Sequence, residues 1–198
     1  MKNFYNDEKW DIVLASASPR RKALLEEYGI KFRIITAFAE EVIIPGNGGE
    51  TVLCNARAKA ESVFAFLREK EGGKDAYLVL GADTVIEADG KVLGKPQDIA
   101  DAEKMLLSLS GKTHKVITGT ALISPEKRKV FAVTTFVTFR SLTLDDVRSY
   151  MKKVSVLDKA GAYAAQEHGE MIIEKMDGSM ENVVGLPVAE ILEELKNW

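Results

Sequence analysis

The sequence has few residues of the kinds that bind zinc or form disulfides. Its single cysteine, Cys54, excludes a disulfide within the chain and is typical of proteins from a reducing compartment. Its two histidines, His114 and His168, are too few for a zinc cluster. No stretch approaches the roughly 20 apolar residues of a membrane-spanning helix, and the opening MKNFYNDEKWD lacks the apolar segment of a secretory signal. We therefore expect a cytoplasmic globular protein without a membrane partner.

The sequence also lacks an excess of positive charge. It contains 27 lysines and arginines and 30 aspartates and glutamates, which gives a net charge of −3. Proteins that bind nucleic acid neutralise its phosphates with a basic surface, so nucleic acid is not an expected partner. Apolar residues make up 46% of the 198 residues, which is enough for one core or for two small lobes that share a core.

Apolar runs alternate with helical patterns along the chain. The apolar runs predict strands at 11–15, 31–35, 77–80, 84–88, 91–93, 114–123, 129–140 and 171–175. Helical spacing and helix-start signals predict helices over 18–28, 50–70, 98–111 and 187–198, with a further helix beginning at Thr143. Asp89-Gly90 predicts a tight hairpin. This order predicts one α/β domain over residues 1–198, with a mixed sheet flanked by helices and two lobes around a central cleft.

A phosphate-binding signal lies at residues 16–21, Ser-Ala-Ser-Pro-Arg-Arg. A predicted strand runs directly into a helix with Ser18 at its N-cap, so the free N–H groups of the first turn favour an anion. The guanidinium groups of Arg20 and Arg21 match pairs of phosphate oxygens, and Ser16 adds a hydroxyl. The alternative is a plain helix cap with solvated arginines. Lys59, among small residues of helix 50–70, and Lys95, in a Gly-Lys-Pro loop, join this set only if the fold brings them together.

Carboxylates supply the acidic side of the candidate site. Asp83 follows the apolar run 77–80, which predicts a position at the carboxyl end of a central strand, where α/β sheets bind ligands. There it could hold a metal ion or take a proton from water. Glu41, in the loop 37–49, could supply a second carboxylate. A hydrogen-bonded turn residue and a solvated charge are the respective alternatives. Gly111-Lys112-Thr113 is not a Walker loop, because it follows a helix and precedes a strand.

Taken in order, these segments resemble the Maf family of nucleotide pyrophosphatases, and the resemblance covers residues 14–192. The matching segments are residues 16–21, Glu40-Glu41, Ala58-Lys59-Ala60, Gly81-Ala82-Asp83-Thr84-Val85, Gly94-Lys95-Pro96, Ser110-Gly111 with His114 and Thr118-Gly119, 158–163 with Gln166, and 182–187.

The resemblance implies a fold like that of inosine triphosphatases, with the active site in a cleft between two lobes. It implies hydrolysis of a nucleoside triphosphate to a monophosphate and pyrophosphate with a divalent cation, and it allows a homodimer. Mg²⁺ or Mn²⁺ is the expected cation because the ligands are oxygens. Asp83 becomes the proton acceptor, and Glu41 a carboxylate on the metal side. The substrate contacts become Ser16, Arg21, Lys59 and Lys95.

The family branch is indicated by three further residues, Arg20, Thr84 and Gln166. They are similar to the branch that acts on dTTP and UTP, whereas the branch acting on 7-methyl-GTP carries an aromatic residue, glutamine and glutamate there. The amide of Gln166 offers a donor and an acceptor, which suits a pyrimidine edge. Glu167 departs from the family pattern and adds a negative charge beside this position.

Two other functions remain as alternatives. The family takes its name from an effect on septum formation, so the chain could be a nucleotide-binding regulator of cell division with little turnover. It could instead be a monophosphatase, which would release orthophosphate rather than pyrophosphate.

Overall fold

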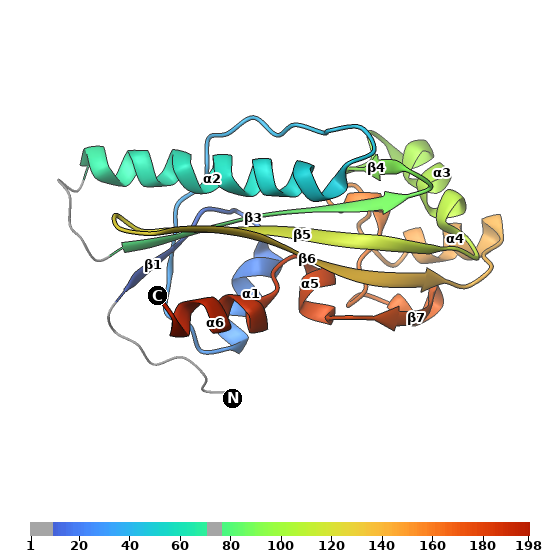
Figure 1. Ribbon diagram of the computed structural model, residues 1–198. Helices are drawn as coiled ribbons and strands as arrows, with labels where there is room; N and C mark the ends of the chain where they lie inside the picture. Colours follow the sequence, from blue (N-terminus) through green and yellow to red (C-terminus); the bar gives the residue numbers. More distant parts are fainter. Residues whose placement is uncertain (1–9, 71–76) are drawn as a thin grey trace.

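The computed structural model describes residues 10–70 and 77–198, and a seven-stranded mixed sheet forms its centre (Figure 1). The strand order is β2-β1-β3-β5-β6-β7, and β4 pairs with β3. Strand β1 runs parallel to β2 and β3, and the remaining pairs are antiparallel. The strands are β1 Asp11–Leu14, β2 Arg33–Ile34, β3 Tyr77–Ala88, β4 Lys91–Leu93, β5 Thr113–Ile123, β6 Arg128–Phe139 and β7 Ile173–Asp177. The predicted α/β fold with a mixed sheet is confirmed.

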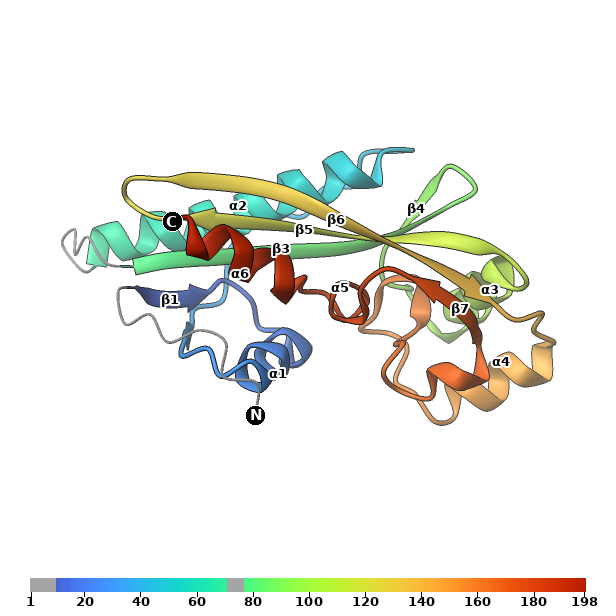
Figure 2. The ribbon, with the colours of Figure 1, turned by 60° about the horizontal axis from the view of Figure 1, so that its bottom comes forward.

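Helices cover both faces of this sheet. Helix α2 lies on one face, and α1, α5 and α6 lie on the other, while α3 and α4 gather near one end (Figures 1 and 2). The helices are α1 Pro19–Glu27, α2 Gly48–Lys70, α3 Ile99–Leu109, α4 Leu144–Met151, α5 Met180–Val184 and α6 Val188–Lys196, with short 3-10 turns at Ala160–Ala162 and Gly169–Met171. None of the helices in the described residues is both long enough and apolar enough to cross a membrane.

Local signals in the sequence place most of the helix starts. The side chain of Asp98 accepts a hydrogen bond from the backbone N–H of Asp101 at the start of α3. Thr143 and Asp146 form a reciprocal capping box at the start of α4. Helix α5 was not predicted, because five residues are too few to show a helical period. The glycine pair expected to end α2, at 72–73, lies outside the described residues.

The buried apolar side chains form separate groups on the two faces and at one end of the sheet. The group under α2 includes Ala56, Ala60, Phe64, Leu67, Val79 and Ala121. The group under α1 and α6 includes Leu14, Leu25, Leu78, Leu80, Ile191 and Leu195. The group around α3 and α4 includes Leu106, Leu109, Val137, Phe139, Val147 and Tyr150. The long strands β3, β5 and β6 run through both halves of the molecule and join them (Figure 1).

The prediction of two separate strands at 77–80 and 84–88 is wrong, because β3 is continuous over Tyr77–Ala88. Strand β5 pairs with it from Val79 to Glu87, so the ladder spans the small residues that looked like a break. Asp83 therefore lies in the middle of a strand. The small residues serve packing instead: a Cβ atom at Gly81 would lie 2.4 Å from the backbone oxygen of Ala56 in α2.

Gly119 allows the same close approach of α2 to β5, and Gly119→Ala is expected to destabilise the fold. The added Cβ would lie 2.4 Å from the backbone oxygen of Val52, which is rigid helix backbone. We expect the free energy of unfolding, measured by urea denaturation, to fall by about 3 kcal/mol. Gly49→Ala is the control, because its Cβ would meet nothing closer than 3.7 Å and alanine favours a helix. A loss at Gly119 no larger than at Gly49 would contradict the packing argument.

Candidate active site

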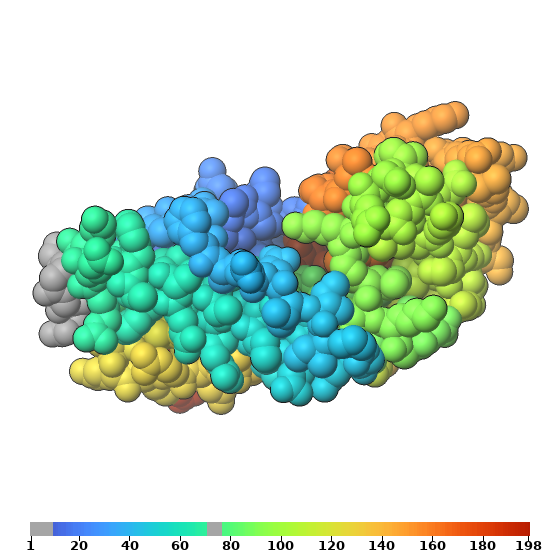
Figure 3. All heavy atoms as spheres, turned by 90° about the horizontal axis from the view of Figure 1, so that it is seen from above, coloured from blue at the N-terminus to red at the C-terminus, as the bar shows by residue number. Residues whose placement is uncertain are grey.

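A pocket opens where one edge of β3 is left uncovered. Strand β1 pairs with β3 only as far as Leu80, and β4 pairs with the same edge only from Ile86 onward. Within the described residues, no strand pairs with positions 81–85 on that side. The pocket has a volume of about 610 Å³, and Figure 3 shows a hollow between the blue N-terminal part and the green and orange part. The carboxyl end of the parallel strand β1 meets this gap, which is where α/β sheets bind ligands.

Every site residue predicted from the sequence borders this pocket. They are Ser16, Arg20, Arg21, Glu41, Lys59, Asp83, Thr84, Lys95 and Gln166. They come from the turn after β1, the start of α1, the loop before α2, α2 itself, β3, the loop after β4 and the segment after the first 3-10 turn. Residues more than 100 positions apart in the sequence thus face one cavity.

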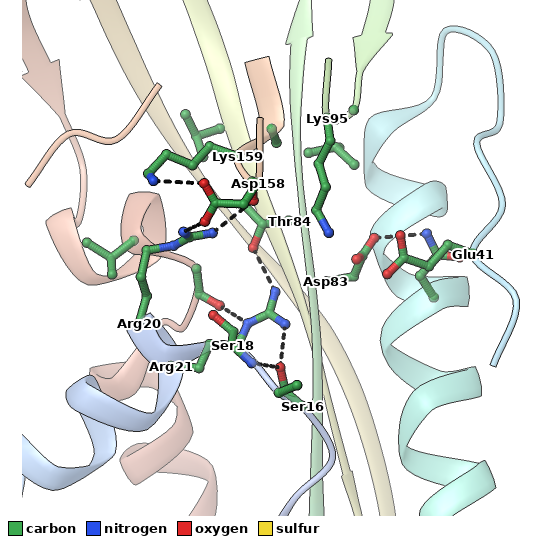
Figure 4. Close-up of a pocket in the computed structure, with 18 of the residues that line it drawn as sticks. Ser16, Ser18, Arg20, Arg21, Glu41, Asp83, Thr84, Lys95, Asp158 and Lys159 are labelled. Atoms are coloured by element: carbon green, nitrogen blue, oxygen red, sulfur yellow. Dashed lines mark hydrogen bonds and ion pairs between the residues drawn. The ribbon is translucent and has the colours of Figure 1, made fainter. Parts of the chain in front are cut away.

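Arg21 is held at the centre of the pocket by three acceptors (Figure 4). Its guanidinium donates to the backbone oxygen of Gly185 at 2.8 Å, to Ser16 Oγ at 3.1 Å and to Thr84 Oγ1 at 3.3 Å. Burial lowers the pKa of Arg21, and the nearby carboxylate of Asp83 opposes that effect. The fixed guanidinium thus presents a half-buried positive charge with a defined direction.

A chain of hydroxyl groups orients Thr84 towards Arg21. Thr118 Oγ1 donates its only proton to the backbone oxygen of Asn182 at 2.8 Å. The 2.9 Å contact between Thr84 and Thr118 therefore has Thr84 as its donor, which leaves the lone pairs of Thr84 for Arg21. Thr118 is fully buried, and its role in the site was missed. The only signal for it in the sequence was its place in the matching segment Thr118-Gly119.

The carboxylates meet on the α2 side of the pocket. Lys59 Nζ lies 2.7 Å from Asp83 Oδ1 and 2.7 Å from Glu41 Oε1. The side chain of Asp83 is 9% exposed, that of Lys59 13% and that of Glu41 53%. Burial alone would raise the pKa of Glu41, but the hydrogen bond and charge of Lys59, with smaller effects of Lys95 and Arg21, hold it below its usual value. The two carboxylates therefore share one ammonium group.

Asn55 links Asp83 to the loop that carries Glu41, and it was not identified from the sequence. Its amide N–H groups donate to Asp83 Oδ2 at 2.9 Å and to the backbone oxygen of Val42 at 2.9 Å, and its oxygen accepts from the N–H of Val42 at 2.9 Å. Asn55 is buried, so these bonds are shielded from water. A single side chain thus fixes Asp83 and the loop that carries Glu41.

Arg20 lies on the opposite wall, in contact with an acidic side chain from a distant segment (Figure 4). Its guanidinium donates to Asp158 Oδ2 at 2.9 Å, and Lys159 Nζ donates to the other oxygen at 3.0 Å. Burial would raise the pKa of Asp158, but the hydrogen bonds from Lys159 and Arg20 outweigh it and lower the pKa. Lys159 also lies 3.6 Å from Glu167, so the additional negative charge beside Gln166 has a cation next to it.

The side chains of Ser18 and Lys95 line the pocket and make no hydrogen bonds within the described residues. Ser18 is the N-cap of α1, as predicted, but its side chain makes no capping hydrogen bond. Its backbone N–H donates instead to Ser16 Oγ at 3.2 Å. Lys95 is exposed, points into the pocket in Figure 4 and makes no hydrogen bond or ion pair with the described residues. Both are placed to meet an anionic ligand.

Comparison with known proteins relates this chain to a family. The sequence pattern of the family described as "Maf-like protein" matches residues 11–198. A dTTP/UTP pyrophosphatase of Akkermansia muciniphila is 49% identical over 185 residues, which cover 92% of this chain and 93% of the relative. Proteins with the same name from Geotalea uraniireducens and Bacillus thuringiensis are each 42% identical, over 95% and 94% of this chain and 95% of each relative. The chain belongs to the Maf-like protein family.

Proposed function

We propose that this protein hydrolyses dTTP and UTP to the nucleoside monophosphate and pyrophosphate. The main observation in support of this function is that one pocket holds the cations Arg21, Lys59 and Lys95 together with the carboxylates Asp83 and Glu41. A triphosphate needs the cations, and activation of water needs a carboxylate. Relatives whose names describe this reaction align over nearly the whole chain, which supports the assignment.

In the proposed reaction, water adds across the α–β anhydride bond. Asp83 takes one proton from the attacking water, and the hydroxyl oxygen ends on one of the two phosphorus atoms of the broken bond. The bridging oxygen stays with the other phosphorus atom, so the monophosphate and pyrophosphate are released, and Arg21 and Lys95 stabilise the negative charge that develops. Positioning and charge stabilisation supply most of the rate acceleration in phosphoryl chemistry, and the three hydrogen bonds that hold Arg21 provide such positioning.

Glu41 and Asp83 fit a divalent cation that arrives with the nucleotide. In the described residues, no three His, Cys, Asp or Glu side chains gather in a way that could hold a metal ion. Mg²⁺ commonly uses one or two carboxylates and fills its other positions with water and phosphate oxygens. Two carboxylates that meet at one ammonium provide this donor set. When bound, the cation would polarise the phosphate oxygens and neutralise developing charge.

We assign recognition of the nucleobase to Arg20, Thr84 and Gln166. Gln166 is exposed at the pocket and carries an amide donor and acceptor for a pyrimidine edge. Arg20 is turned towards the same wall by Asp158. The hydroxyl of Thr84 is already committed to Arg21 and Thr118, so Thr84 acts on the substrate through the direction of Arg21.

The test is to incubate the protein with Mg²⁺ and a panel of nucleoside triphosphates and to identify the products by ion-exchange chromatography. The panel includes dTTP, UTP, 5-methyl-UTP, CTP, dATP, GTP and 7-methyl-GTP. We expect monophosphate and pyrophosphate from dTTP and UTP. Orthophosphate would favour a monophosphatase, and binding without turnover would favour a nucleotide-binding regulator. Pyrophosphate from another base would retain the reaction and reject the base assignment.

Asn55→Leu is expected to lower the kcat for dTTP by about 10- to 100-fold, as loss of a group that orients an active-site ligand commonly does. The KM should change little, because Asn55 donates its hydrogen bonds to Asp83 and Val42 and none is shared with Arg21, Lys59 or Lys95. Thr51→Val is the matched control: Thr51 anchors the same loop through the N–H of Ile44 at 3.0 Å without a bond to Asp83. An equal loss of kcat in both variants would mean that only the loop matters.

A cytoplasmic location and a homodimer complete the proposal. The single cysteine, Cys54, suits a reducing compartment. Light scattering after gel filtration measures the oligomeric state.

A further inference from the structure

The ammonium group of Lys59 lies at the point where both carboxylates would offer oxygens to a metal ion. It is 2.7 Å from Glu41 Oε1 and 2.7 Å from Asp83 Oδ1. The other oxygen of Asp83 accepts a hydrogen bond from Asn55 at 2.9 Å. A cation bound by both carboxylates must therefore take the place of an ammonium group that already satisfies them.

We propose that Lys59 competes with the divalent cation and keeps the metal position closed until a triphosphate draws its ammonium group away. The inference rests on the proposed function, because it takes the metal and the triphosphate as ligands of this pocket. A divalent cation and an ammonium group cannot share the same two oxygens, since like charges at contact distance repel strongly. Removal of Lys59 from the carboxylates is thus a step in metal binding.

Lys59 is suited to this exchange because lysine is a compact charge on a flexible stem with three donors. Its side chain lines the pocket and is 13% exposed, so it can contact an anion that binds there. Arg21 is different: its three hydrogen bonds hold it in one direction. When a triphosphate enters, Lys59 can transfer its donors from carboxylate oxygens to phosphate oxygens without losing charge compensation.

The proposal makes metal and nucleotide binding interdependent. Without nucleotide, metal binding must break two charge-assisted hydrogen bonds, so the affinity for the metal alone is low. With nucleotide, Lys59 gains new acceptors, and the metal finds both carboxylates open. By linkage, the metal then strengthens nucleotide binding by the same factor.

The experiment measures Mn²⁺ binding to the nucleotide-free protein from the electron paramagnetic resonance signal of free Mn²⁺. Lys59→Met removes the ammonium group and keeps the length of the stem, and we expect it to bind Mn²⁺ at least about ten-fold more tightly than the unaltered protein, a factor typical of coupled sites. Adding Glu41→Gln to Lys59→Met should cancel the gain. Lys59→Gln serves as a second variant if Lys59→Met does not fold.

Lys95→Met is the matched control, because it removes the same charge from the same pocket at a residue that bonds neither carboxylate. We expect it to change the Mn²⁺ affinity less than about three-fold, since a charge that is not in contact acts through solvent. Unchanged Mn²⁺ affinity in the Lys59 variants, or an equal gain in Lys95→Met, would overturn the proposal. The titration contains no nucleotide, so failure of the unaltered protein to release pyrophosphate would count against the proposed function separately.

Discussion

Asp83→Asn is expected to reduce the kcat for dTTP and UTP by about a thousand-fold, in the range lost when a general base is removed. An asparagine amide has nearly the size of the carboxylate but cannot take a proton from water. In the unaltered protein, Lys59 and Asn55 both donate hydrogen bonds to Asp83. The asparagine amide places an N–H donor next to one of these two donors. Nucleotide binding should persist, because Arg21 and Lys95 remain.

Turnover is measured as pyrophosphate release, and binding by calorimetry with a non-hydrolysable α,β-imido analogue of dTTP. Asp158→Asn is the matched control, since it makes the same change at a carboxylate of the same pocket that contacts Arg20 instead. Its kcat should fall less than about ten-fold, as expected for a partly exposed ion pair. Comparable losses in both variants would reject Asp83 as the proton acceptor. A cellular effect that survives Asp83→Asn would favour the regulatory alternative.

Arg21→Lys is expected to lower kcat/KM by about 100-fold for every substrate, a loss typical of removing one oriented donor to developing charge. Lysine keeps the charge but is not a planar fork, so it cannot bond Gly185, Ser16 and Thr84 together in the same directions. The remaining ammonium group would no longer face the phosphates at a fixed angle.

Arg20→Lys provides the comparison for Arg21→Lys, because the same change is made one residue earlier, at a side chain that is 28% exposed and paired with Asp158. We expect Arg20→Lys to alter the ratio of kcat/KM between dTTP and the other nucleotides more than its absolute value for dTTP. The measurement is kcat/KM across the nucleotide panel. A uniform loss in Arg20→Lys that matches the loss in Arg21→Lys would contradict the role of Arg20 in base selection and assign it to the phosphates, like Arg21.

Most helices and strands could be predicted because their signals are local. The antiparallel pair at 114–123 and 129–140 is confirmed as β5 and β6, since apolar residues recur at every second position. Thr143 and Asp146 lie three residues apart, so the capping box is visible in the sequence. Strand β2 is shorter than predicted, two residues instead of five, because only Arg33 and Ile34 pair with β1.

The interior of the site could be predicted only in part. Residues such as Arg21 and Asp83 stand out because charged side chains next to buried strands are unusual. Asn55, Thr118 and Asp158 carry no such signal, since a polar residue inside a helix, a strand or a loop is ordinary. Their importance comes from partners that are distant in the sequence. Asn55 bonds Asp83, 28 positions away, and Thr118 bonds Thr84, 34 positions away. Asp158 bonds Arg20, 138 positions away.

By itself, the sequence determined the alternation of helices and strands, the acidic balance of charge and the residue types available for a triphosphate site. These properties depend on spacing along the chain and on composition. Only the tertiary structure decided that Asp83 lies within a continuous strand, that Lys59 bridges two carboxylates and that Arg21 is fixed by Gly185, 164 positions away. Such contacts arise when packing of α1 and α2 on opposite faces of the sheet brings distant segments to the open edge of β3.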